Sequence, residues 1–254
     1  QDIRLNALRC LEGGARRHLH YGQGSPFPDL TLPCGGMLWV LLDPDPDLRA
    51  LNRAHQTLLA RRPARLSFST GESAAPLAME YAPKPRVILA GRGAVFRATA
   101  KLSQAAGFDV TCLTPDDADE RAVARFSESP VVPLVSPDTA TDLALDRWSA
   151  FLTLFHDHAW EPHLLRQALK TSCRFIGSLG SDRTHRLRKV ALMDMGCAAE
   201  DIERIKGPVG LVPTLRSSDL IAASVVADLA GVFCRSQRPV DDALSTQASQ
   251  LTTV

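Results

Sequence analysis

A pair of glycines after an apolar run is the first place where residue types and spacing indicate ligand chemistry. Gly91-Arg92-Gly93 follows Arg86 and the apolar residues 87–90 and precedes a helical pattern. In dinucleotide-binding loops the first glycine permits a tight turn, and the second lets the backbone approach a phosphate at a helix N-terminus. Phe96 replaces the third glycine of that pattern, and Thr114 stands where an acidic residue for the ribose is expected. The motif therefore predicts a Rossmann-type turn and leaves nucleotide binding open.

A second glycine-rich loop, Gly177-Ser178-Leu179-Gly180-Ser181, lies between a predicted strand and a predicted helix. Its backbone N–H groups and Ser181 are suited to hold an anion or to cap the helix. Arg183, Arg186 and Arg188 follow on that helix. The alternative to an anion site is a capped helix with a solvated basic face.

A cluster of histidines and carboxylates follows another predicted strand. His156-Asp157-His158 is followed by Glu161 and His163. The spacing differs from the His-Glu-x-x-His of a helical zinc site. Because alternate strand residues share a face, His156 and His158 are expected on one side and Asp157 on the other. We favour a polar edge lining a ligand cleft over a metal site.

Cys34 is the one cysteine that lies outside an apolar element, in Cys34-Gly35-Gly36. A thiolate can act as a nucleophile or as a metal ligand. Two following glycines would let a ligand approach the backbone closely. The alternative is that Cys34 is only a small residue in a tight turn.

The elements that must position these residues follow a strand–helix rhythm after residue 85. Strands are expected at 86–91, 108–113, 131–135, 149–155 and 173–177, with helices at 94–106, 139–147, 160–170, 181–196 and 217–235. Such alternation predicts an α/β fold with a doubly wound parallel sheet. The loops at 91–95, 156–160 and 177–181 should then meet at the carboxyl edge of that sheet.

The first part of the chain reads as a smaller α+β domain. It contains expected helices at 3–17 and 47–61 and expected strands at 36–43, 65–70 and 77–82. Pro83 and Pro85 resist both helix and central strand and mark a joint. We therefore expect an α+β domain at 1–84, a Rossmann-like domain at 85–235 and a loose polar tail at 236–254.

Composition excludes several classes of function. The 29 Lys+Arg and 28 Asp+Glu residues give a net charge of +1, which argues against nucleic acid or an anionic membrane as partner. No apolar run approaches the roughly 20 residues of a membrane helix. No basic-then-apolar leader follows Gln1, so no signal peptide is expected. Six scattered cysteines favour free thiols in a reducing cytoplasm.

Taken together, the motifs resemble the XdhC/CoxI family, the accessory proteins of xanthine dehydrogenase and related molybdenum hydroxylases. The resemblance spans about residues 30–235 and is carried, in the family's order, by Leu-Pro-Cys-Gly-Gly at 32–36, Gly-Arg-Gly at 91–93, His-Asp-His at 156–158, Gly-Ser-Leu-Gly-Ser at 177–181, Gly-Pro-Val-Gly-Leu at 207–211 and the apolar helix at 219–228. The chain differs from the family's usual residues at three places. Ala94 stands where the family has a His, and Thr114 stands where it has an acidic residue. Val212-Pro213-Thr214 stands where the family has Asp-Ile-Gly.

The resemblance implies a two-domain chaperone rather than an enzyme. Such proteins bind the molybdenum cofactor (molybdopterin), a pterin with a phosphate and a dithiolene and with or without a nucleotide. They deliver it to the apo form of a xanthine dehydrogenase-type hydroxylase, and some support its sulfuration with a cysteine desulfurase. A homodimer is implied as well.

For this chain the resemblance implies Cys34 as the residue that contacts molybdenum or its sulfur. The remaining residues expected at the cofactor are Gly35, Gly36, Gly91, Arg92, Gly93, His156, His158, Gly177, Ser178, Gly180 and Ser181.

Three other functions remain open from the residues alone. Arg92 between two glycines would suit the 2′-phosphate of NADP, so an NAD(P)-dependent Rossmann oxidoreductase is the main alternative. A metal-dependent hydrolase would use His156, His158 and Glu161. A scaffold that binds partner proteins without any cofactor is the third.

Overall fold

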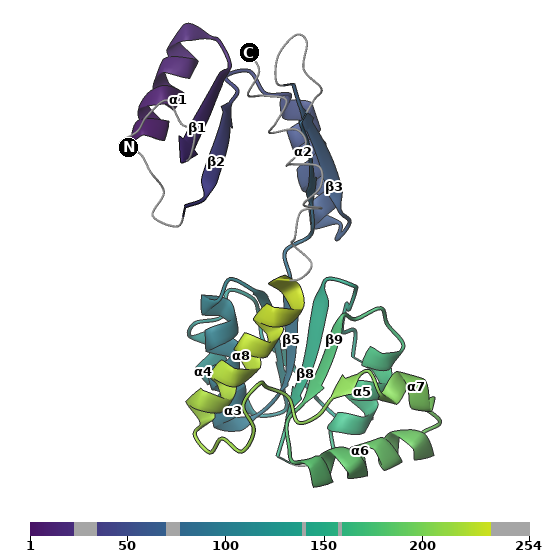
Figure 1. Ribbon diagram of the computed structural model, residues 1–254. Coiled ribbons are helices and arrows are strands. Elements are labelled where there is room, and N and C mark those ends of the chain that lie inside the picture. The colour runs from purple at the N-terminus through teal and green to yellow at the C-terminus, as the bar shows by residue number, and fades with distance from the viewer. Residues whose placement is uncertain (23–34, 70–76, 139–140, 157–158, 235–254) are drawn as a thin grey trace. The chain divides into compact units, whose positions relative to one another are not determined.

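The protein divides into two compact units, Gln1–Tyr81 and Ala82–Val254 (Figure 1). The structure is a computed structural model that describes residues 1–22, 35–69, 77–138, 141–156 and 159–234. The expected tail at 236–254 lies outside the described residues. Among the helices described, none is long and apolar enough to cross a membrane.

The larger unit is built on a six-stranded parallel sheet with the strand order β10-β9-β8-β5-β6-β7. The strands are β5 (Arg86–Gly91), β6 (Asp109–Thr114), β7 (Val132–Pro133), β8 (Ser149–Leu154), β9 (Phe175–Ser178) and β10 (Ile205–Lys206). The chain starts in the centre at β5 and winds outward in both directions, which is the order of a Rossmann domain. The predicted fold class and the four predicted neighbouring strands are confirmed.

The central strands are buried on both faces, as their continuous apolar sequences predict. All six residues of β8 are buried. Ile88 and Phe151 belong to one core cluster, whereas their neighbours Leu89 and Leu152 belong to the other. Because successive strand residues point to opposite faces, each strand contributes to a core on both sides of the sheet.

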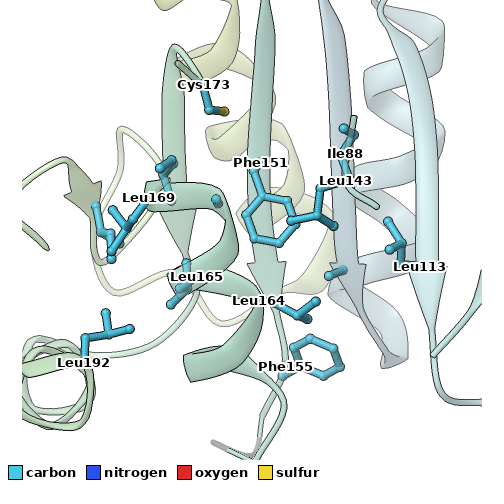
Figure 2. Packing of buried hydrophobic residues seen from close by; sticks show 14 of the residues in the cluster. Ile88, Leu113, Leu143, Phe151, Phe155, Leu164, Leu165, Leu169, Cys173 and Leu192 are labelled. Atoms are coloured by element: carbon cyan, nitrogen blue, oxygen red, sulfur yellow. The ribbon is translucent and has the colours of Figure 1, made fainter. Parts of the chain in front are cut away.

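Helices cover both faces of this sheet. They are α3 (Gly93–Ala105), α4 (Asp117–Ala124), α5 (Glu161–Leu169), α6 (Asp182–Asp194), α7 (Ala199–Ile202) and α8 (Ser218–Cys234). Leu164, Leu165 and Leu192 of α5 and α6 belong with Phe151 to the core cluster on one face (Figure 2). Residues of α3, α4 and α8 form the core on the other face.

In its described residues, the smaller unit contains two helices and two antiparallel strand pairs. The elements are α1 (Asp2–Gly13), β1 (Arg17–Gly22), β2 (Met37–Leu42), α2 (Leu48–Leu59), β3 (Ala64–Phe68) and β4 (Leu77–Tyr81). β1 pairs with β2, and β3 pairs with β4. The Asp47 carboxylate caps α2 by accepting 2.9 Å hydrogen bonds from the N–H groups of Arg49 and Ala50.

The predicted helix at 3–17 is wrong in its second part. Helix α1 ends at Gly13, and Gly14 adopts a left-handed conformation with φ 64° while its N–H bonds to the Cys10 carbonyl. This is a common way to end a helix, since glycine adopts positive φ without strain. The residues after it form β1, which the sequence pattern did not predict.

The predicted helix at 139–147 is also wrong, because residues 141–147 contain no helix. The Asp142 carboxylate accepts a bond from the N–H of Ala144, and the Asp146 carboxylate accepts one from the N–H of Trp148. Ala144 itself has φ 44°. Such local side-chain bonds compete with a helical backbone, and here they prevail.

Candidate functional site

The loops after β5, β8 and β9 lie at the carboxyl edge of the parallel sheet, as predicted. In Figure 1 this edge is at the lower end of the larger unit, where α6 runs. The strand order reverses between β5 and its neighbour β8. Ligands of open α/β sheets bind at such a switch point.

The Gly91–Gly93 turn and His156 meet at this point. A Cβ on Gly91 would lie 2.7 Å from the Leu154 carbonyl oxygen, so only glycine lets β5 and β8 approach this closely. Gly93 has φ +84°, and a Cβ placed on it would lie 3.9 Å from Nε2 of His156. The exposed His156 side chain therefore lies next to the glycine that opens α3.

The N-terminus of α3 is bonded to a carboxylate of this same chain. The Gly93 N–H donates a 2.6 Å hydrogen bond to Oδ2 of Asp119, a residue that is 3% exposed. The other carboxylate oxygen pairs with the guanidinium of Arg97 on α3. Sequence analysis missed Asp119 because it did not predict α4, although the cap-like Asp116 is a signal for that helix.

The end of β6 carries no acidic residue that could bind a ribose. Thr114 is 2% exposed, and its Oγ1 accepts a 3.3 Å bond from the N–H of Asp116. Asp116 caps α4 through the N–H groups of Asp119 and Ala118. These hydrogen bonds, that from Asp119 foremost, lower the pKa of the Asp116 carboxyl.

Two residues of the second glycine loop are covered by protein atoms. A Cβ on Gly177 would lie within 2.7–2.9 Å of side-chain atoms of Leu152, Val209 and Phe175. The Ser178 hydroxyl is fully buried and pairs with the Thr153 hydroxyl. In this structure Gly177 and Ser178 therefore hold β9 against its neighbours, and their contact with a cofactor stays a prediction.

The next part of that loop is exposed. Gly180 has φ +137°, and its missing Cβ would lie 2.8 Å from Cγ2 of Thr184. Ser181 caps α6, its hydroxyl accepting a 3.2 Å bond from the Thr184 N–H. Arg183 and Arg186 are exposed on the same helix. Of the loop, Gly180 and Ser181 are the residues that an anion can reach.

A buried ion pair lies beneath this loop. Arg188 and Glu161 each have 2% exposed side chains, and the guanidinium donates bonds of 3.0–3.2 Å to both carboxylate oxygens. Thr153 Oγ1 donates a further bond of 3.3 Å to Glu161. Arg188 thus does not belong to a solvated basic face, and Glu161 is engaged by protein groups rather than by a metal.

Arg188 is also hydrogen-bonded to the loop between β9 and α6. Its NH2 group donates a 2.7 Å bond to the carbonyl of Leu179, and its NH1 group lies 3.3 Å from Nδ1 of His185. Desolvation, followed by the charge of Arg188, lowers the pKa of His185. The His185 ring fills the place of a side chain at Gly207, where a Cβ would lie 2.2 Å from Nδ1. One buried network therefore joins the ends of β8, β9 and β10.

The segment after β10 is hydrogen-bonded to α8. The Gly210 N–H donates a 3.2 Å bond to Asp228, which also pairs with Lys206 at 2.6 Å. The Ser224 hydroxyl accepts bonds of 2.8 Å from the N–H groups of Leu211 and Val212. The sequence suggested no role for Asp228 or Ser224, since their partners lie at least twelve residues away.

The remaining candidate residues lie in the smaller unit or outside the described residues. Cys34 and His158 lie outside the described residues. Gly35 is exposed with φ +69°, and the Gly36 carbonyl oxygen lies 2.2 Å from where a Cβ of Gly22 would be. Within the described part of the chain, no three His, Cys, Asp or Glu side chains gather in a way that could hold a metal ion.

Comparison with known proteins identifies the family. Residues 87–229, which hold the whole parallel sheet except the first residue of β5, match the family model described as XdhC Rossmann domain. The chain belongs to the XdhC family. The predicted resemblance is thereby confirmed.

Two individual proteins extend this match beyond the XdhC Rossmann domain. The chain is 30% identical over 246 residues to the molybdenum cofactor insertion chaperone PaoD of Escherichia coli (strain K12), covering 90% of this chain and 70% of PaoD. A crystal structure described as a xanthine dehydrogenase from Bacillus halodurans superposes with a TM-score of 0.72 at 21% identity, covering 97% of this chain and 83% of that one. The similarity to the Bacillus halodurans structure supports the fold of this chain.

Proposed function

We propose that this XdhC-family chain binds the molybdenum cofactor as cargo and delivers it to the apo form of a xanthine dehydrogenase-type hydroxylase. The observation that carries the proposal is the 30% identity to a molybdenum cofactor insertion chaperone over 90% of this chain. That similarity includes both compact units. Insertion of a cofactor requires an enzyme that receives it, so the proposed partner is an apo-hydroxylase.

The loop between β9 and α6 is the proposed place for the phosphate of the cargo. Gly180 and Ser181 are exposed there, at the N-terminus of a 13-residue helix. Backbone N–H groups and the helix dipole favour an anion at such an end. The exposed Arg183 adds positive charge at the second residue of the helix. His156 belongs to the same sheet edge and is proposed to contact the pterin.

Cys34 is proposed to contact molybdenum or the sulfur placed on it. Molybdenum in the cofactor already has two dithiolene sulfur ligands, and thiolates suit metals that prefer soft ligands. In this proposal a cysteine desulfurase supplies the sulfur, and the protein works as a homodimer in the cytoplasm.

Cys34→Ala tests the proposal directly. The variant should keep the wild-type melting temperature but lose most of its ability to activate apo-hydroxylase in the presence of added molybdenum cofactor. Cys234→Ala is the matched control, because Cys234 is an exposed thiol at the end of α8. Equal activation by Cys34→Ala and wild type would show that the thiol takes no part.

An NAD(P)-dependent oxidoreductase has less support. The backbone N–H of Gly93 that would bind a dinucleotide phosphate is donated to Asp119. Titration with NADPH should therefore leave the tryptophan fluorescence of the wild-type chain unchanged, whereas a saturable change would favour the oxidoreductase.

A further inference from the structure

We propose that Asp119 is a built-in anion that excludes phosphate-bearing nucleotides from the Rossmann crevice of this chain. Its carboxylate occupies the position at the N-terminus of α3 where dinucleotide-binding folds hold a pyrophosphate. The inference is independent of the proposed function, because it concerns β5, α3 and α4 rather than the loop assigned to the cargo.

The contact is the one that a phosphate would otherwise make. Asp119 Oδ2 accepts the N–H of Gly93 at 2.6 Å, at the first residue of α3. The positive end of the helix dipole is thereby satisfied by a negative charge from the chain itself. A phosphate brought to the same N–H would meet a carboxylate within a few ångströms, and the two like charges repel strongly in a partly buried site.

The carboxylate is held in place from two sides. Arg97, one turn along α3 from Gly93, pairs with its second oxygen. On α4, the N–H of Asp119 donates a 2.9 Å bond to the capping carboxylate of Asp116. Asp119 is 3% exposed, so moving it away would open both α3 and the first turn of α4.

Two further residues lie at the carboxyl ends of β6 and β8, the strands on either side of β5. Thr114, at the end of β6, is buried where the ribose-binding acid of a dinucleotide fold stands. The His156 ring lies against the open side of Gly93, 3.9 Å from the position of a Cβ there. Of these groups, the Asp119 carboxylate is the one that already binds the Gly93 N–H.

Isothermal titration with ADP-ribose and with NADH, in the absence of molybdenum cofactor, tests this role. The wild-type chain should show no saturable heat. Asp119→Ala should show saturable binding of ADP-ribose, at least about tenfold tighter than the weakest affinity that the titration of wild type could detect, because the Gly93 N–H and Arg97 become available to the pyrophosphate.

Two control variants separate exclusion from general loosening. Asp116→Ala removes the cap of α4 but keeps the Asp119 carboxylate, so it should gain no binding. The binding gained by Asp119→Ala should persist when Arg183→Gln is added, because Arg183 lies on α6 at the other loop.

Saturable binding of either nucleotide by the wild-type chain would overturn the inference. So would an Asp119→Ala variant that melts like wild type and still binds nothing. If Asp119→Ala does not fold, Asp119→Asn replaces it, since it keeps the shape and removes the charge. Asn at this position should give a smaller but measurable gain, and no gain would again overturn the inference. This test does not measure cofactor delivery. A negative result would therefore contradict the role of Asp119 without contradicting the proposed function.

Discussion

At the scale of single residues, the site depends on two charged groups that sequence analysis did not single out correctly. Asp119 and Glu161 each lie 26 or 27 residues from a bonding partner, Gly93 and Arg188 respectively. Contacts at that separation are created by the fold and leave no local pattern. Ser181, by contrast, was predicted as a possible cap, because its Thr184 partner lies three residues away.

Replacement of Arg188 is predicted to be strongly destabilising. Arg188→Met leaves the Glu161 carboxylate buried without its cation, and breaking such a pair costs about 3–5 kcal/mol of the free energy of unfolding. The exposed Arg186→Met on the same helix is the control and should change stability by less than about 0.5 kcal/mol. Chemical denaturation of the two variants measures the difference.

A double variant checks the cause. Adding Glu161→Gln to Arg188→Met removes the buried charge and should recover part of the lost stability. If Arg188→Met unfolds at the same denaturant concentration as Arg186→Met, the buried pair does not stabilise the fold.

At the scale of elements, the sequence predicted the strands of the parallel sheet except β10, and it missed β1 in the smaller unit. Runs rich in apolar residues identified β5, β6, β8 and β9, as expected for strands that are buried on both faces of a parallel sheet. β10 has two residues, too few for any periodicity, whereas β7, also of two residues, lies inside the strand predicted at 131–135. The predicted helix at 139–147 failed since aspartate side chains bond the local backbone there.

The docking of α6 against the end of β10 is predicted to depend on pH. Folding lowers the pKa of His185 below its ordinary value of 6.5. As the pH falls, this histidine is therefore protonated in the unfolded chain before it is protonated in the folded protein. The resulting stability is fully present above pH 6.5 and decreases as the pH falls through the lowered folded value.

His185→Gln should flatten this part of the stability profile. Unfolding of the larger unit would be measured between pH 7.5 and roughly 5 for wild type, for His185→Gln and for the control His55→Gln on α2, the range bracketing the ordinary histidine pKa. A wild-type profile that stays level below pH 6.5, or that His185→Gln leaves unchanged, would contradict the assignment.

At the scale of the whole molecule, the proposed function draws on both compact units. Gly35 and Gly36 belong to the smaller unit, and the exposed loop at Gly180 and Ser181 belongs to the Rossmann unit. The family match covers residues 87–229, while the similarity to the insertion chaperone covers 90% of the chain. The fold was predictable from sequence because it rests on apolar periodicity, whereas the site rests on contacts between elements.

The central claim is that the chain carries molybdenum cofactor, and retention of the cofactor tests it most directly. The full chain would be incubated with cofactor released from a molybdenum hydroxylase and re-isolated by gel filtration. Molybdenum would be measured by mass spectrometry and the pterin by fluorescence after oxidation. The account predicts that both elute with the protein in near-equimolar amounts. A folded chain that elutes with neither molybdenum nor pterin would contradict it.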